Sequence, residues 1–387
     1  MKKIFLLILF IITILGLFNL SIKINANEEF NLEVSSKSGV LYEPLTGTII
    51  YEKNGYEELP PASMTKLMTM ILVCEALDKN IITIDQKLRT SKYANSMGGT
   101  QIYLKENEEM CVEDLLKSVA LASANDAAIV LAEGIAGSCN SFVNMMNMKA
   151  KEIGLTNTCF KNPNGLPEEG HYSCAVDMAK MGAYLVNNYG DFILKYTSLY
   201  EDYVREDLEN KFWLVNTNKL VKHVEGVDGL KTGWTEEAGY CLTCTMNKND
   251  VRMISVIMGA ETIEQRTEET LSLLNYGVAN YEVKKIYSEG DIIETIEDVA
   301  YKPTIYHIAL KEDVYILNKK GNEYIDISEE RIINYDNLVS NGDVGSMKIS
   351  VDNIVIKEVE LFVLEDVKKA NIFIIILEVL KEIFFVA

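Results

Sequence analysis

Histidine, proline and basic residues are scarce in this chain of 387 residues. Its three histidines, His171, His223 and His307, lie far apart and match none of the His and Cys spacings of zinc sites, so we expect no metal and no cofactor. The chain has 37 Lys and Arg residues against 57 Asp and Glu residues, a net charge of −20 that would repel a phosphate backbone. The composition therefore argues against nucleic acid as a partner.

Cysteines number seven, an odd count without the spacing of a disulfide framework. At most three pairs could form, and we expect mostly buried thiols. Cys241 and Cys244 have C-x-x-C spacing, but they lie in Tyr240–Met246, which we interpret as a strand. Positions three apart in a strand point to opposite faces, so redox or metal chemistry is not expected there.

The N-terminus has the organisation of a secretory signal. Lys2 and Lys3 precede an apolar run over Ile4–Phe18, and the more polar stretch Asn19–Ala26 follows. We predict a signal peptide over residues 1–26 and an exported protein. An uncleaved membrane anchor is the alternative, because Ile24 is larger than the residue usually preferred two places before a cleavage site.

The C-terminus is apolar but amphipathic. Within Ala370–Ala387 the polar residues fall on one helical face, and they are Asn371, Glu378, Lys381 and Glu382. So many charges argue against a bilayer span and favour an interfacial helix over residues 367–387, lying on a membrane surface. A core helix of the last domain is the alternative.

The pattern between these ends predicts two folded units. A strand hairpin over Gly39–Glu52, helical periodicity from Met64 to about Tyr196, strands over Cys241–Met258 and a helix over Thr262–Tyr276 indicate an α+β domain over residues 27–280. We expect its helices to pack on an antiparallel sheet. Residues 281–366 carry short alternating runs and no catalytic constellation, which predicts a small all-β domain with a supporting role.

Ser63-Met64-Thr65-Lys66 opens the helical block, directly after Pro60-Pro61-Ala62. Residues three apart share a helix face, so Lys66 would contact Ser63. A serine hydroxyl becomes nucleophilic when a neighbouring base accepts its proton, and burial can lower the pKa of a lysine enough for that task. Free amides at the helix start offer a donor to an oxyanion. Taken alone, a solvated helix start remains the alternative.

Ser123-Ala124-Asn125 is expected at a corner between two helices. Its serine and asparagine could relay a proton and orient a substrate. An ordinary helix N-cap by Ser123 or Asn125 is the alternative. Ser138-Cys139-Asn140 matches the same S-x-N pattern, but we expect Ser138 to cap the helix that follows it.

Lys231-Thr232-Gly233 begins the strand section. Lysine charge and a threonine hydroxyl suit a carboxylate, and glycine lets a substrate backbone approach closely. The backbone N–H of Trp234 could be a second oxyanion donor. As an isolated tripeptide this motif would more often be a turn.

In this order and context the three motifs resemble those of low-molecular-weight penicillin-binding proteins, the serine-type D-alanyl-D-alanine carboxypeptidases. Nearly the whole chain takes part in the resemblance. The similar segments include Leu59–Ser63, Leu121–Ala128, Asn162–Leu166, Gly170–Ser173, Asp228–Gly233 and Ala238–Tyr240. The resemblance implies a β-lactamase/transpeptidase-like domain followed by a β domain and a membrane-associated amphipathic helix.

The resemblance also implies residue roles. Ser63 would attack the D-Ala-D-Ala carbonyl, with Lys66 as base. Ser123 would carry the proton to the leaving D-alanine. Substrate would be bound by the remaining site residues, which are Asn125, Lys231, Thr232, Gly233, Trp234 and Arg266. The expected partners are peptidoglycan stem peptides ending in D-Ala-D-Ala, with β-lactam antibiotics as inhibitors.

Two residues depart from the family pattern, Ala124 where glycine is frequent and Trp234 where a smaller or different aromatic group is common.

Two other functions are alternatives to a carboxypeptidase. A serine β-lactamase would need a positioned carboxylate, and Glu168 and Glu169 stand without its E-x-x-L-N pattern. A catalytically idle wall-binding module is the other, since fold does not fix function. We expect His171 to be a hydrogen-bonded structural residue.

Overall fold

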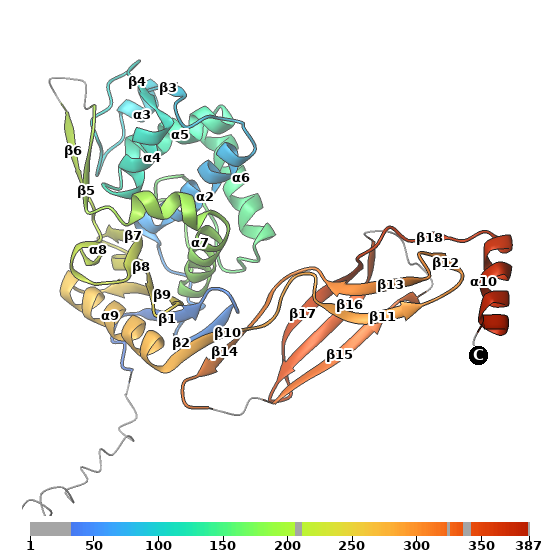
Figure 1. Ribbon diagram of the computed structural model, residues 1–387. Helices are drawn as coiled ribbons and strands as arrows, with labels where there is room; N and C mark the ends of the chain where they lie inside the picture. The colour runs from blue at the N-terminus through green and yellow to red at the C-terminus, as the bar shows by residue number, and fades with distance from the viewer. Residues whose placement is uncertain (1–31, 206–210, 323–325, 336–341, 386–387) are drawn as a thin grey trace, which may run out of the picture. The chain divides into compact units, whose positions relative to one another are not determined.

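The computed structural model describes residues 32–205, 211–322, 326–335 and 342–385 (Figure 1). The expected signal peptide over residues 1–26 lies outside this described part. Among the described residues, no helix is both long and apolar enough to cross a membrane.

A five-stranded antiparallel sheet forms the centre of the first half of the fold (Figure 1). Its strand order is β2-β1-β9-β8-β7, so that β1 of the N-terminal hairpin pairs with β9, a strand more than 200 residues later. The five strands are β1 (Ser38–Glu43), β2 (Thr48–Lys53), β7 (Val227–Thr235), β8 (Gly239–Lys248) and β9 (Val251–Ala260). Strand β7, which carries the Lys231 motif, is an edge strand.

Two long helices cover opposite faces of this sheet. Successive strand residues point to opposite faces, and Met253 packs on Gly277 of α9 (Ile263–Asn280) whereas Ile254 packs on Gly182 of α7 (Ala175–Thr197). Both faces are therefore buried, which explains why β8 and β9 are apolar along most of their length. The predicted strands and closing helix are confirmed.

A block of shorter helices packs around α2. This helix is buried along most of its length because apolar residues surround nearly its whole circumference. The helical periodicity predicted from Met64 to about Tyr196 is confirmed over most of that length. The elements of the block are η1 (Ala62–Thr65), α2 (Lys66–Asp78), α3 (Lys92–Asn95), α4 (Val112–Ala120), α5 (Asn125–Ala136) and α6 (Cys139–Glu152). The short helix α8 (Leu220–His223) contacts strand β7.

One small strand pair interrupts the helical block predicted from Met64 to about Tyr196, and a second pair follows that block. Strand β3 (Lys87–Arg89) pairs with β4 (Glu109–Cys111), and β5 (Glu201–Val204) pairs with β6 (Phe212–Val215). Three or four residues are too few to establish a period of two, so the sequence did not predict these pairs.

From residue 281 the chain is built of strands until its last helix. One sheet has the order β11-β13-β17-β16-β15, and the buried side chains here, among them Tyr306, Met347 and Leu361, form a separate core. The chain ends in α10 (Ile372–Phe385), as expected. The strands are β10 (Tyr281–Tyr287), β11 (Ile292–Glu297), β12 (Tyr301–Lys302), β13 (Ile305–Leu310), β14 (Val314–Lys319), β15 (Ile327–Ile333), β16 (Asp343–Val351), β17 (Ile354–Val363) and β18 (Lys368–Lys369).

All seven cysteines lie in the described part of the chain and are free thiols. Cys74, Cys174, Cys241 and Cys244 are buried, and the other three are partly buried. The expectation of mostly buried thiols is confirmed.

Candidate active site

Ser63 lies in the short helix η1, one turn before α2 begins at Lys66. Pro61 occupies the N-cap position of η1, where the missing proline N–H leaves no bond unmade. The Nζ of Lys66 is 3.0 Å from the Oγ of Ser63, so the predicted contact between these two residues is formed. Ser63 is partly exposed, whereas Lys66 is fully buried.

Three oxygens surround the Nζ of Lys66. Besides Ser63 Oγ, these are Asn125 Oδ1 at 2.7 Å and the Asn164 carbonyl at 2.6 Å. Carbonyl oxygens only accept hydrogen bonds. In the structure the Lys66 amine donates to all three oxygens. A neutral amine has only two N–H groups, which the two carbonyls can accept, so in that form its lone pair could accept from the Ser63 hydroxyl. Burial, and then the charge of Lys231, hold the pKa of Lys66 well below its usual value, although Asp126 acts in the opposite direction.

The second motif forms the corner between α4 and α5, as predicted. Ser123 has a φ of +63°, a left-handed backbone conformation that costs a non-glycine residue about 1 kcal/mol or more. The alternative of an N-cap role is wrong, because Ala124 holds the N-cap position of α5 and no side chain caps it. Asn125 donates from Nδ2 to the Gly98 carbonyl at 2.8 Å, which orients its Oδ1 toward Lys66. Ser138 caps α6, as expected.

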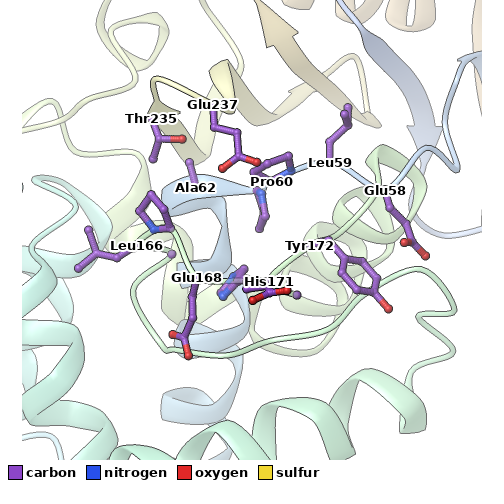
Figure 2. A pocket seen from close by; sticks show the side chains of 15 residues that line it. Glu58, Leu59, Pro60, Ala62, Leu166, Glu168, His171, Tyr172, Thr235 and Glu237 are labelled. Carbon is purple, nitrogen blue, oxygen red and sulfur yellow. The ribbon is translucent and has the colours of Figure 1, made fainter.

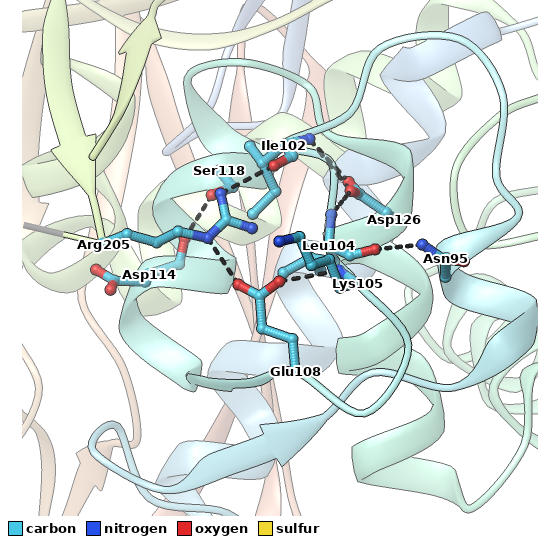
Figure 3. A network of polar contacts seen from close by, with 9 residues as sticks. All are labelled: Asn95, Ile102, Leu104, Lys105, Glu108, Asp114, Ser118, Asp126 and Arg205. Carbon is cyan, nitrogen blue, oxygen red and sulfur yellow. Dashed lines mark hydrogen bonds and ion pairs between the residues drawn. The ribbon is translucent and has the colours of Figure 1, made fainter. Parts of the chain in front are cut away.

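A buried carboxylate supports this corner (Figure 3). Asp126 is fully buried and accepts from the backbone N–H groups of Ile102 and Leu104, at 3.2 and 3.0 Å. Arg205 joins the same loop, since it donates to the Ile102 carbonyl and pairs with Glu108 at 2.6 Å. The loop between α3 and β4 is thereby held beside Asn125.

The third motif lies on edge strand β7, against the turn that carries Ser63. A Cβ added at Gly233 would come within 2.8 Å of the Pro61 carbonyl, so only glycine allows this approach. Lys231 is buried, and burial together with the charge of Arg266 lowers its pKa to about 7. Its Nζ donates to the Thr232 carbonyl at 3.1 Å.

Arg266 and Trp234 differ in their surroundings. Arg266 lies on α9 and is only 7 % exposed. Its Nε is buried with no hydrogen-bond partner among the described residues, and its charge lies close enough to Lys231 to lower that lysine's pKa. Trp234 is 58 % exposed, with its ring 6.0 Å from that of Tyr240. Its side chain joins none of the other candidate groups.

The segment from Lys161 to His171 fixes the third acceptor of Lys66. A Cβ on Gly165, whose φ is +81°, would lie 1.9 Å from the Ala62 carbonyl. Nδ1 of His171 accepts from the Lys161 N–H, so the neutral ring carries its proton on Nε2, which contacts Thr65 Oγ1 at 2.8 Å. His171 is thus hydrogen-bonded as expected, and it joins this segment to the turn of Ser63.

A cavity of about 580 Å³ opens beside these residues (Figure 2). Pro60, Pro61 and Ala62 line it next to Ser63, Thr235 and Glu237 line it from the end of β7, and residues 165–172 complete it. Figure 2 shows the labelled side chains of these three segments around a common space. The cavity therefore adjoins both the turn of Ser63 and the end of β7.

Sequence reasoning missed three contributors. These are the carbonyl of Asn164, the carboxylate of Asp126 and the hydroxyl of Thr217, which accepts from Thr232 Oγ1 at 2.7 Å. The Asn-Pro-Asn-Gly turn could have pointed to Asn164, whereas nothing near Thr217 signals a role. Within the described ranges, no group of three or more His, Cys, Asp or Glu residues could hold a metal ion.

Two protein-family models match the chain. One, described as D-alanyl-D-alanine carboxypeptidase, matches residues 24–262, and the other, described as Penicillin-binding protein 5, C-terminal domain, matches residues 281–369. The first match covers the part of the chain that contains the five-stranded sheet, and the second covers the strands from β10 onward.

Individual proteins are similar over most of the chain. D-alanyl-D-alanine carboxypeptidase DacF of Bacillus subtilis is 45 % identical over 340 residues, 87 % of either chain. The crystal structure of penicillin binding protein 5 from Haemophilus influenzae matches with a TM-score of 0.75 and 29 % identity, over 87 % of this chain and 98 % of that one. Penicillin-Binding Protein D2 from Listeria monocytogenes, in its ampicillin-bound form, matches with a TM-score of 0.58 and 32 % identity, over 64 % and 99 %.

Proposed function

Because the chain belongs to the D-alanyl-D-alanine carboxypeptidase family, we propose that it removes the terminal D-alanine from peptidoglycan stem peptides through an acyl-enzyme on Ser63. The observation that carries the proposal is the contact of buried Lys66 with Ser63 Oγ at 3.0 Å, while two carbonyl oxygens occupy the other sides of the amine. This arrangement suits a serine nucleophile and a neutral lysine base.

The acylation step follows from these contacts. Ser63 Oγ attacks the carbonyl carbon of the penultimate D-alanine, and its proton passes to Lys66. The scissile C–N bond then breaks. The Ser123 hydroxyl gives its proton to the amine of the departing D-alanine and takes up the proton held by Lys66, which returns to its neutral form. Backbone N–H groups of Ser63 and Trp234 hold the oxyanion, since β7 and the Ser63 turn approach closely at Gly233. Water later hydrolyses the Ser63 ester.

Two parts of the substrate supply binding energy for this step, its terminal carboxylate and its upstream stem residues. Lys231, Thr232 and Arg266 bind the terminal carboxylate of the substrate, and Asn125 orients its peptide group. The upstream stem residues follow β7 toward Thr235 and enter the cavity lined by Pro60 and His171. The exposed ring of Trp234 borders this path.

The same reaction accounts for inhibition by β-lactams. When Ser63 opens the lactam ring, the amine stays attached to the acyl group and blocks the approach of water. A persistent Ser63 adduct with penicillin is therefore expected. A serine β-lactamase would instead release the hydrolysed drug rapidly.

The test is intact mass spectrometry of the purified chain after incubation with benzylpenicillin, followed by peptide mapping. We expect a lasting adduct on Ser63 and release of D-alanine from a pentapeptide ending in D-Ala-D-Ala. Ser63→Ala should remain folded and lose both activities. D-alanine release by the Ser63→Ala variant would contradict the proposal, and a transient adduct with drug turnover would favour a β-lactamase.

We also propose that the protein works at the outer face of the cytoplasmic membrane. Residues 1–26 would direct export, and α10 would attach the chain to the lipid surface. The support comes from the exposed apolar side chains of α10, which include Ile372, Phe373 and Leu377.

A further inference from the structure

Thr217 lies between two buried asparagines that hold its backbone rigidly. Asn216 donates from Nδ2 to the carbonyls of Thr197 and Leu199, at 2.9 and 2.8 Å. Asn218 donates from Nδ2 to the Gly229 carbonyl at 3.0 Å. Both asparagines are 1 % exposed, so these bonds are protected from water. The half-buried Thr217 side chain is thereby presented at a defined place.

Thr217 connects the second and third motifs. Its backbone N–H donates to the Leu121 carbonyl at 3.0 Å, two residues before Ser123. Its Oγ1 accepts from the hydroxyl of Thr232 at 2.7 Å. The Thr232 hydroxyl is therefore already engaged when no substrate carboxylate is present.

Binding of a carboxylate requires this hydroxyl pair to reorganise. A carboxylate only accepts, so Thr232 must turn its proton from Thr217 toward the ligand. The Thr232 oxygen is then free to accept from the hydroxyl of Thr217. Two consecutive hydrogen bonds then run from Thr217 to Thr232 and from Thr232 to the carboxylate. The first bond orients the Thr232 hydroxyl and strengthens its charge-assisted bond to the carboxylate.

Two basic side chains, Lys231 and Arg266, indicate the kind of ligand that binds beside the Thr217–Thr232 hydroxyl pair. Lys231 and Arg266 form no ion pair with any described residue, and the Arg266 Nε has no partner. An anion is the group that these two cations lack. We propose that Thr217 is a positioning residue of the carboxylate subsite, which holds the Thr232 hydroxyl in line for the substrate's terminal carboxylate. This inference rests on the proposed function.

Comparison of benzylpenicillin with its methyl ester tests the inference, because the ester lacks the free carboxylate. The measurement is the second-order rate constant for acylation of Ser63, followed by mass spectrometry. We expect Thr217→Val to lower the rate with benzylpenicillin about tenfold, the effect of one hydrogen bond in a chain ending on a charge, and to change the rate with the ester less than twofold. Thr217→Ser, which keeps the hydroxyl, should restore most of the rate.

Thr232→Val gives a matched control. If the two hydroxyls act as one chain, the Thr217→Val/Thr232→Val double variant should lose little more than Thr232→Val alone. Equal losses with the acid and the ester, or additive losses in the double variant, would overturn the inference while leaving Ser63 as the acylated residue. Absence of any wild-type adduct would overturn the proposed function itself and the inference with it. Unfolding curves in urea check that each variant is folded.

Discussion

Individual side chains at this site have their charge states set by burial. Lys66 and Lys231 are both fully enclosed cations, and each has a lowered pKa, first because water is absent and then because another cation is near. For Lys66 the lowered pKa favours the neutral amine, which the proposed role as a base requires. For Lys231 it leaves a group that gains a proton readily once an anionic substrate provides a partner.

His171 allows a test of burial through stability. Burial lowers its pKa from 6.5 to about 4, with Lys161 contributing in the same direction and Glu168 opposing. Between these values the unfolded chain binds a proton that the folded chain does not, so stability falls as pH falls from 6.5 to 4. Across this window the wild type should lose about 3 kcal/mol more than His171→Gln, whose amide cannot titrate.

Urea unfolding at several pH values measures this difference. Carboxylates that titrate near pH 4 contribute equally to both proteins and cancel in the comparison. Parallel pH profiles for the wild type and His171→Gln would show that the folded protein binds the proton at His171 as readily as the unfolded chain.

At the scale of elements, the site depends on close packing between the segment that precedes α7 and the start of α2. Three successive contacts join the segment before α7 to the start of α2. Thr65 contacts His171, Lys66 contacts the Asn164 carbonyl, and Thr69 donates to the Pro163 carbonyl at 2.6 Å. Gly165 lies at the closest point, since its Cα approaches the Ala62 carbonyl. The position of the Asn164 acceptor therefore depends on this glycine.

Gly165→Ala should displace the segment and remove an acceptor from Lys66. We expect acylation of Ser63 by benzylpenicillin to slow at least tenfold, because the buried Lys66 amine would lose one of the two carbonyl acceptors that orient it, and a buried donor left without a partner costs about 1–3 kcal/mol. The matched control is Gly154→Ala, where φ is +71° but an added Cβ meets nothing within 4 Å. That variant should lose about 1 kcal/mol of stability from backbone strain alone and keep its acylation rate. Equal acylation rates in the two variants would contradict the steric argument.

For the molecule as a whole, charge and apolar surface act in opposite directions at a membrane. The net charge of −20 repels anionic lipid, whereas α10 exposes Phe373, Ile376, Leu377 and Leu380 at spacings that form one stripe. On the same helix Glu378 pairs with Lys302 at 2.8 Å. Burial of the stripe must then supply the binding energy for a lipid surface.

Vesicle cosedimentation of the full chain tests this balance. We expect binding to vesicles containing anionic lipid to persist or increase when salt is raised, because salt screens the repulsion and leaves the apolar contribution intact. Phe373→Ser with Leu377→Ser should abolish binding, since each buried side chain contributes about 2 kcal/mol. Lys381→Gln, which leaves the stripe unchanged, is the control. Release of the wild type by salt would indicate an electrostatic attachment instead.

Local features were determined by the sequence alone. The Ser63–Lys66 contact follows from the spacing of three residues at a helix start, and the Ser138 cap follows from the preference of serine for N-cap positions. Long periodic helices and the alternating strands were likewise predictable, because each pattern repeats often enough to be distinguished. The short pairs β3–β4 and β5–β6 were not, since each repeats too few times.

The convergence of the site was decided only by the tertiary structure. Asn125 reaches Lys66 across 59 residues of chain, and Thr217 meets Thr232 across 15, at distances that no local rule specifies. Resemblance to a family led to the three motifs and included the segment around Asn164, but it assigned no role to the Asn164 carbonyl and gave no reason to select Thr217. The pKa values of Lys66 and Lys231 also depend on packing, because desolvation arises only when distant segments close over a side chain.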